Sequence, residues 1–496
     1  MARMARSAAT RSLTTTAVAL AGLAAATIGA LIKPTTPPRG WNSYDAWGAS
    51  DENITVASAE GLLSSGLAAA GYTAITIDAG WFGSPVRIDE YGRPLPVQQM
   101  YPSSGVSGDF KPLADHIHKM NLTFGLWYMA GIPKPAFDAN SPIKGTQYTV
   151  RDVATNTTYC PRWDKGWGYE VDHTHPAAQA WYDSLVELWA GWGIDLIKLD
   201  CVNAEDELYA HREDIIALST SMAASDKGFV FSLSPGGFSN VSQANAIAPY
   251  VSMARATDDF WDTWSLYMDS GGGNGPLSGY SHWDAARDMV TTVRNHPPTY
   301  WIDLDMLPFG RIGHQRHCKS PPASGPGCWR QSRFSTEESK AILTLWSLVQ
   351  SPLIMGGDVR EGILSRDVAA MMCNPKLAAM SASIQSAAEV LRTNNTASAG
   401  GGHIVWRATA TPGGQYVAVF NLVNESASTT IMWADAGISP DPTPGLVSVS
   451  DIWNDKPFDD FKGGFFTASL PPHGVLLLEL TEGAKATPAG KGGGGY

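Results

Sequence analysis

The stretch G-I-D-L-I-K-L-D-C-V-N, residues 193–203, decides the fold of this chain. Its apolar residues form a run of strand length, which brings Lys198 and Asp200 to its carboxyl end. A helix-like segment at residues 176–192 comes directly before it and makes an αβ unit. Because barrel enzymes keep their catalytic groups at the carboxyl ends of parallel strands, Asp200 is the reference point for the rest of the chain.

Strand-like runs alternate with helix-like runs on both sides of this unit. Eight strand candidates lie at residues 39–44, 72–81, 122–131, 194–201, 229–235, 250–259, 300–307 and 352–358. Helix candidates lie at residues 57–70, 111–120, 176–192, 207–224 and 335–350. This alternation predicts an α/β fold, a (β/α)₈ TIM barrel, over residues 37–385.

The pattern changes after about residue 385. Short alternating runs follow at residues 415–422, 446–453 and 474–480, with Gly, Pro and Asn between them. They predict a C-terminal antiparallel β-sandwich over residues 386–482. The Gly-rich segment 483–496 is of low complexity and predicts a disordered tail.

The N-terminus suggests a secretory route. Arg3, Arg6 and Arg11 precede an apolar run at residues 14–32, so residues 1–32 are expected to be a signal peptide, or an anchor if they stay uncleaved. Asn-x-Ser/Thr sites occur at Asn53, Asn121, Asn156, Asn240, Asn394 and Asn424. These features predict a secreted, extracellular glycoprotein, with membrane contact only if the N-terminal segment is retained.

The net charge and the cysteines bear on the binding partners and on possible disulfides. The net charge of −12, with no basic cluster beyond the N-terminus, argues against a nucleic-acid partner. Of the five cysteines, Cys318 and Cys328 are close in sequence and flank a Pro/Gly loop, so they could pair. Cys160 and Cys201 could pair across the barrel mouth, which would leave Cys373 free. The connectivity stays open at this point.

A metal-free hydrolase needs two carboxylates across one pocket, and Asp200 is the first. The sixth strand candidate, A-R-A-T-D-D-F-W-D-T-W at residues 254–264, supplies Asp258 and Asp259. Lys198 lies on the same side of its strand as Asp200 and is expected to keep that carboxylate ionised. The general acid is expected in a drier or more negative place, because it must hold a proton. The alternative is that these acids only cap helices or form salt bridges.

A metal site is the rival chemistry. His116 and His118 fall two apart in a helix-like run and so do not share a face, and His173 and His175 come just before a helix start. We expect neither a metal nor an organic cofactor. The chain also has no P-loop, no dinucleotide fingerprint and no G-x-S-x-G elbow.

Seven motifs together resemble glycoside hydrolase family 27, the α-galactosidase family. They are G-W-N-S-Y (40–44), I-D-A-G-W (77–81), F-G-L-W (124–127), K-L-D-C (198–201), R-A-T-D-D-F-W-D-T-W (255–264), D-L-D-M-L (303–307) and L-P-P-H-G (470–474). The resemblance covers about residues 37–480 and implies a barrel followed by a sandwich. It is closest to a branch with plant enzymes that act on both α-D-galactosides and β-L-arabinopyranosides.

The resemblance also implies roles for residues. Asp200 would be the nucleophile and Asp259, from an R-x-x-x-D pattern, the acid/base of a retaining double displacement. The residues that would bind the sugar are Tyr44, Asp78, Trp127, Lys198, Ser234, Arg255, Asp305 and Met306.

Three positions depart from the family pattern. Ala79 stands where α-galactosidases have a second acid, which favours a pentopyranose without the exocyclic CH₂OH. Ser234 stands where many have a Glu and leaves room for a 2-acetamido group. Cys201 comes one residue early, which puts its pairing with Cys160 in doubt.

These features predict an exo-glycosidase that removes terminal α-D-galactosyl residues from small or polymeric glycosides. A β-L-arabinopyranosidase, or dual specificity, is the alternative. An α-N-acetylgalactosaminidase and a non-catalytic sugar-binding protein are minor alternatives.

Overall fold

The computed structural model describes most of the chain. The described residues are 31–159, 167–202, 211–235, 241–269, 281–293, 300–313, 327–393, 402–411, 413–438, 447–458 and 464–482. The predicted tail at residues 483–496 and nearly all of the predicted signal segment lie outside them.

Eight parallel strands form one curved sheet, which confirms the predicted barrel. In sheet order they are β10 (Trp301–Asp303), β9 (Met253–Arg255), β8 (Val230–Ser234), β7 (Leu196–Asp200), β3 (Thr123–Met129), β2 (Ala74–Ile77), β1 (Arg39–Asn42) and β13 (Leu353–Met355). A parallel bridge between Leu307, just after β10, and Met355 of β13 links the two ends of the sheet. Each strand coincides with a predicted one, because a strand buried on both faces leaves an apolar run in the sequence.

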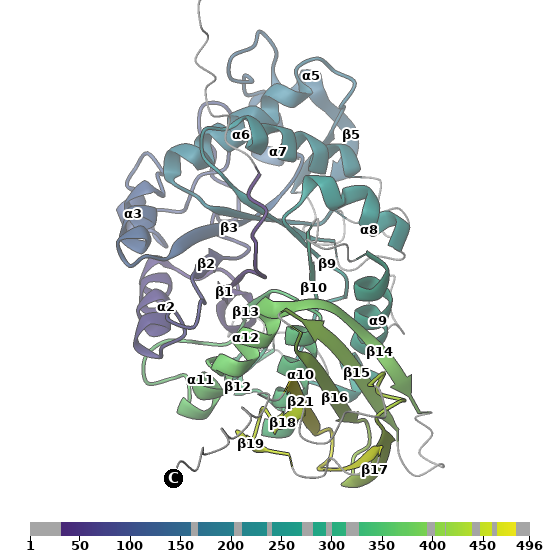
Figure 1. Cartoon of the computed structure of the whole chain (residues 1–496). Coiled ribbons are helices and arrows are strands. Elements are labelled where there is room, and N and C mark those ends of the chain that lie inside the picture. Colours follow the sequence, from purple (N-terminus) through teal and green to yellow (C-terminus); the bar gives the residue numbers. More distant parts are fainter. Residues whose placement is uncertain are drawn as a thin grey trace, which may run out of the picture.

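Helices surround this sheet (Figure 1). They include α2 (Glu52–Ser64), α3 (Lys111–Lys119), α6 (Ala178–Trp192), α7 (Arg212–Ala224), α8 (Val241–Ile247), α9 (His282–Val293), α10 (Thr336–Leu348), α11 (Arg366–Met372) and α12 (Pro375–Ser383). α2 begins five residues earlier than predicted because the Asp51 carboxylate caps it, accepting a hydrogen bond from the Ile54 amide at 2.8 Å.

Two insertions at the barrel mouth were not predicted. After β3, β4 (Ile132–Pro133), β6 (Gly168–Val171) and β5 (Ala154–Tyr159) form a small antiparallel sheet with α4 (Lys134–Ala139) and α5 (Val150–Val153) nearby. After β10, the two-residue strands β11 (Arg311–Ile312) and β12 (Arg330–Gln331) pair as antiparallel neighbours. Two-residue strands such as β4, β11 and β12 leave no recognisable period in the sequence.

The C-terminal part is antiparallel, as predicted. One sheet contains β14 (Ile384–Arg392), β15 (His403–Ala410), β16 (Gln415–Asn421), β21 (Val475–Glu482), β18 (Val447–Asp451) and β19 (Lys456–Pro457); β17 (Ala427–Met432) pairs with β20 (Phe465–Leu470) in a second. A separate apolar core includes the Trp433 and Phe466 rings, whose centroids are 4.4 Å apart.

The sandwich packs directly against the barrel on the side of α9 and α10 (Figure 1). His473 from the L-P-P-H-G motif binds Glu338 of α10 at 2.8 Å and stacks on Trp264 at 4.4 Å between ring centroids. Trp453 donates a hydrogen bond to Thr344 at 2.9 Å. The sandwich therefore contacts the segment that follows β9, which contains Asp259.

Cys201 and Cys328 are each disulfide-bonded, whereas Cys373 is a free thiol, as expected. Cys160 and Cys318 lie outside the described residues, so the proposed pairings stay predictions. Among the described residues, no helix combines the length and the apolar character needed to cross a bilayer.

Candidate active site

Asp200 ends β7, and two donors hold its carboxylate. The Trp127 indole donates to Oδ2 at 2.8 Å and the Cys201 amide donates to Oδ1 at 2.6 Å. Cys201 has a φ of 54°, a left-handed conformation that is costly for a residue with a side chain. Burial raises the pKa of Asp200, and the Lys198 charge and the Trp127 hydrogen bond offset this only in part. The carboxylate is thus fixed in direction on a strained turn.

Lys198 binds Asp78, not Asp200. Its ammonium lies 2.9 Å from Asp78 Oδ2, and both side chains are buried. Asn42 at the end of β1 donates to the same oxygen at 2.8 Å. Burial lowers the pKa of Lys198, but the charges of Asp78, Asp200 and Asp305 outweigh burial and raise it overall. Lys198 therefore favours the ionised form of Asp200, as expected, but through its charge alone and without a direct ion pair.

Asp259 forms an ion pair with Arg255, four residues earlier, at 2.8 Å. The Asp259 side chain is 64% exposed, whereas that of Arg255 is 5% exposed. Partial desolvation favours the neutral acid, but the Arg255 charge and hydrogen bond outweigh it and lower the pKa of Asp259. The expectation of a drier, proton-holding acid is wrong for the unliganded protein, because the guanidinium lies directly beside this carboxylate.

Arg255 also joins Asp259 to the centre of the barrel. It donates to Ser234 Oγ at 3.2 Å and lies 3.6 Å from Asp305 Oδ1. Asp305 has a φ of 82°, and its carboxylate accepts a hydrogen bond from the Phe260 amide at 2.7 Å. Burial raises the pKa of Asp305, and Asp259 adds to this while Arg255 opposes it. A small cavity of about 30 Å³ is lined by Arg255, Ser234 and Asp305 together with Lys198 and Met306.

Tyr44 feels the charge of both candidate catalytic acids. Burial raises the pKa of its hydroxyl, and the charges of Asp259, Asp78 and Asp200 raise it further. The Tyr44 ring is also 6.3 Å from that of Trp261, between centroids. The carboxylates from β7 and from the end of β9 therefore both contribute to the electrostatic field at this hydroxyl.

Two arginines bind the buried Asp262 and hold the segment that contains Asp259. Asp262 is fully buried and accepts hydrogen bonds from Arg330 at 2.6 Å and from Arg333 at 2.9 Å. Burial would raise the pKa of Asp262, but the hydrogen bonds from these arginines hold it below its usual range. The β11–β12 hairpin region, through these arginines, fixes the chain three residues beyond Asp259.

Several polar residues of the site were not predicted as site residues. Asn42 and Ser43 both bind Asp78, through the Asn42 amide and the Ser43 hydroxyl. Asp45 is buried, and burial raises its pKa well above the usual range. A side chain at Gly356 would clash with Asp45, since its Cβ would lie 1.8 Å from Oδ2. The position of Asn42 and Ser43 in the G-W-N-S-Y motif, directly after the first strand, was the available signal.

Two of the four histidines considered as metal ligands bind carboxylates. His118 lies 2.7 Å from Asp195, and His173 lies 2.8 Å from Asp214. Within the part of the chain that the structure describes, no three His, Cys, Asp or Glu side chains gather as a metal site.

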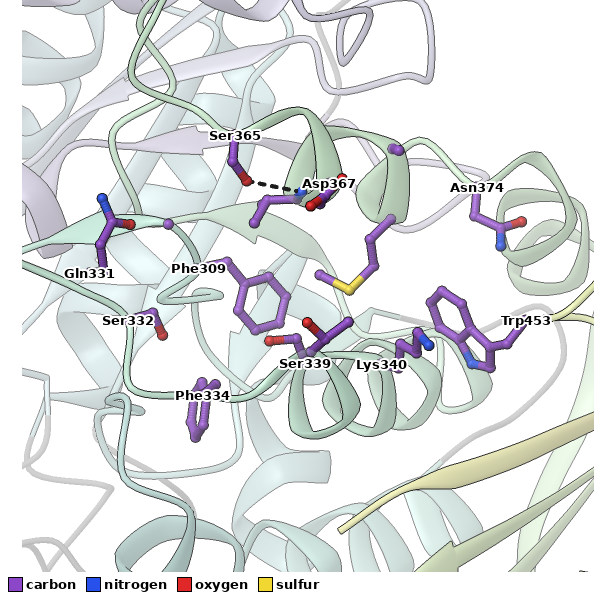
Figure 2. A pocket seen from close by; sticks show the side chains of 15 residues that line it. Phe309, Gln331, Ser332, Phe334, Ser339, Lys340, Ser365, Asp367, Asn374 and Trp453 are labelled. Carbon is purple, nitrogen blue, oxygen red and sulfur yellow. Dashed lines mark hydrogen bonds between the residues drawn. The ribbon is translucent and has the colours of Figure 1, made fainter. Parts of the chain in front are cut away.

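A second cavity, of about 390 Å³, lies outside the catalytic centre. Figure 2 shows Phe309 in its middle, Gln331 and Ser332 on one side, and Trp453 on the other. Its walls come from the hairpin region, from α10 and α11, and from the sandwich. The cavity therefore lies between the β11–β12 hairpin and the sandwich residue Trp453.

Known proteins share this architecture over nearly the whole chain. Residues 400–480 match the family described as the alpha galactosidase C-terminal beta sandwich domain. A GH27 β-L-arabinopyranosidase from Geobacillus stearothermophilus, solved in complex with arabinose, superposes with a TM-score of 0.77 at 30% identity, covering 91% of this chain and 98% of that chain.

Two α-galactosidases are more distant. That of Cyamopsis tetragonoloba is 24% identical over 455 residues, 90% of this chain and 86% of the relative. α-Galactosidase I from Mortierella vinacea superposes with a TM-score of 0.65 at 21% identity, covering 91% of this chain and 98% of that chain, which supports the fold alone. Because the bacterial relative is 30% identical along almost its entire length, this chain belongs to glycoside hydrolase family 27 and is a glycoside hydrolase.

Proposed function

We propose that this enzyme is a retaining exo-glycosidase that removes terminal α-D-galactosyl residues. One observation carries the proposal: Arg255, which binds Asp259 at 2.8 Å, and Lys198, which lies two residues before Asp200 on β7, line the same small cavity. Two carboxylates around one small pocket are what a retaining double displacement requires. The α-galactosidases among the relatives support the choice of sugar.

Asp200 is the proposed nucleophile. The Trp127 and Cys201 donors fix both of its oxygens, and fixed orientation lowers the entropic cost of attack. In the first step Asp200 forms a bond to the anomeric carbon while the glycosidic C–O bond breaks. In the second step water attacks that carbon and releases Asp200 as the carboxylate.

Asp259 is the proposed acid/base. In the free enzyme, Arg255 keeps Asp259 ionised. A bound substrate therefore has to raise the pKa of Asp259 before Asp259 can protonate the leaving oxygen. Substrate in the mouth would exclude water from the exposed Asp259 carboxylate, and desolvation favours the protonated form. In the second step the ionised form accepts the proton of the attacking water.

The proposed sugar contacts are those of the central polar network. Lys198 and Arg255 would bind sugar hydroxyls, and Asp78 would accept hydrogen bonds from the O4 region. Tyr44, Trp127, Ser234, Asp305 and Met306 would complete the pocket: Ser234, Asp305 and Met306 line the central cavity, and Trp127 binds the Asp200 carboxylate.

A β-L-arabinopyranosidase is the second candidate, and Ala79 favours it. Ala79 follows Asp78 directly and offers a methyl group where a second carboxylate would bind an exocyclic hydroxyl. A pentopyranose has no such hydroxyl to leave unpaired. The arabinopyranosidase relative has the same overall fold. An α-N-acetylgalactosaminidase is a third candidate, favoured only by the small side chain of Ser234.

Paired assays test these candidates. Initial kcat/KM values for nitrophenyl α-D-galactoside, β-L-arabinopyranoside and α-N-acetylgalactosaminide would rank the three sugars. NMR of the first-formed product would show its anomer, and retention of configuration is expected. Inversion would refute the double displacement, and hydrolysis of none of the three would refute the proposed substrates.

We further propose that the protein is secreted. The support is the basic and then apolar character of residues 1–32. The Ile32 amide donates to the Phe229 carbonyl at 2.8 Å, so cleavage before Leu31 would preserve this barrel contact. N-terminal sequencing of the protein from culture medium tests the proposal, and recovery of an intact Met1 in the cell fraction alone would contradict it.

A further inference from the structure

Trp329 is unusually exposed for a tryptophan of this protein. It is 40% exposed, more than any other tryptophan among the described residues. Covering the exposed part of this ring with an apolar ligand surface would be favourable.

Three contacts hold this ring. The Trp329 indole donates to the Ala46 carbonyl at 3.3 Å. Trp47 packs edge to face with it at 5.2 Å between centroids, and the Arg311 guanidinium lies 4.9 Å from its centroid. A ring fixed in this way loses little further freedom when a ligand binds, so stacking on it is efficient.

These contacts place Trp329 at the mouth of the barrel. Ala46, which accepts its hydrogen bond, comes two residues after Tyr44. Arg330, the next residue, binds Asp262 at 2.6 Å, three residues after Asp259. Trp329 is therefore tied on one side to the segment with the sugar-contacting tyrosine and on the other to the segment with the acid/base.

We infer that Trp329, backed by Arg311, forms the surface on which the leaving group of the substrate stacks. This inference rests on the proposed function, because a leaving group exists only if Asp259 protonates a glycosidic oxygen. The leaving group has to extend from Asp259 towards solvent, and Trp329 lies on that rim. The chemical class preferred is a leaving group with a flat apolar ring face, such as an aryl ring or the C–H face of a pyranose.

The test compares substrates of one sugar with and without a ring to stack. Wild type, Trp329→Ala and Trp329→Phe are assayed on the nitrophenyl glycoside and on the glycosyl fluoride, whose leaving group is a single atom. Trp453→Ala is the matched control, because Trp453 also lies near a cation, Lys340 at 6.0 Å, but across the second cavity (Figure 2). kcat/KM is the readout, because it reports the step in which the leaving group departs.

We expect Trp329→Ala to lower kcat/KM for the nitrophenyl glycoside about tenfold, as loss of an aromatic contact implies, and to leave the fluoride within about twofold. Trp329→Phe should restore most of the loss, and Trp453→Ala should change neither substrate. An equal loss on both substrates would show a merely structural role and overturn the inference, as would no loss on either. If wild type cleaves neither substrate, the proposed function itself fails and the inference falls with it.

Discussion

Removing the Lys198 ammonium tests how much the buried Lys198–Asp78 ion pair contributes to stability. Lys198 and Asp78 lie 2.9 Å apart, with side chains only 12% and 2% exposed. Lys198→Met therefore leaves a buried carboxylate whose remaining side-chain donor is Asn42. Breaking a buried pair from one side costs about 3–5 kcal/mol, so we expect the free energy of unfolding to fall by that amount at pH 7.

The same substitution should change catalysis in a specific direction. The Lys198 charge lowers the pKa of Asp200, against the effect of burial. Without it the pKa of Asp200 should rise, so the acidic limb of the kcat/KM profile should move to higher pH. Measured values of kcat/KM from about pH 3 to 8 would show the shift.

Two comparisons make the prediction sharp. Lys134→Met removes an exposed ion pair with Asp138, 50% and 57% exposed, and should leave the free energy of unfolding nearly unchanged because solvent screens the pair. Adding Asp78→Asn to Lys198→Met removes the unpaired charge and should recover part of the stability but none of the activity. The reasoning is refuted if urea unfolding shows equal losses for the two lysine variants, or if the acidic limb stays in place.

Four further substitutions test residues of the same site. Asp200→Ala should abolish turnover and keep the fold, and near-wild-type activity of this variant would contradict the role of nucleophile. Asp259→Ala should lose far less activity on nitrophenyl glycosides than on alkyl glycosides, since a good leaving group needs no proton. An equal loss on all leaving groups would contradict the role of acid/base. Burial and the Asp305 charge raise the pKa of Asp303 to about 7. The folded state then binds more protons than the unfolded state between about pH 4 and 7, so stability falls as pH rises through that window, by at most about 4 kcal/mol. Asp303→Asn should flatten this slope in urea titrations, and an unchanged slope would show that Asp303 does not cause it. Ala79→Asp should raise the ratio of galactoside to arabinopyranoside kcat/KM by about 10- to 100-fold, the range expected for one charge-assisted hydrogen bond; an unchanged ratio would exclude Ala79 as the determinant.

Most of the fold could be predicted from the sequence because its signals are local. A barrel strand such as β7 is apolar along its length, and a helix such as α6 has a matching period, so each is visible without its neighbours. The short hairpin strands β11 and β12 were missed because they depend on Asp262, Asp45 and α1 (Tyr44–Trp47) for their position.

For the candidate site, too, the residues could be predicted from the sequence but their pairings could not. Asp78, Asp200, Arg255 and Asp305 could be selected because each stands at the carboxyl end of a predicted strand. Which of them pair could not be predicted, since Lys198 and Asp78 are 120 residues apart and meet only in the closed barrel. The lowered pKa of Asp259 could not be predicted from the sequence either, because it depends on the distance to the Arg255 guanidinium.

By itself, the amino-acid sequence determined the eight-stranded barrel, the sandwich after it and the acidic residues at the strand ends, because apolar periodicity and strand order act along the chain. The tertiary structure alone decided the charge state and the partners of those acids. Electrostatic effects depend on distance and on burial, and both are set only when segments far apart in sequence close around one pocket.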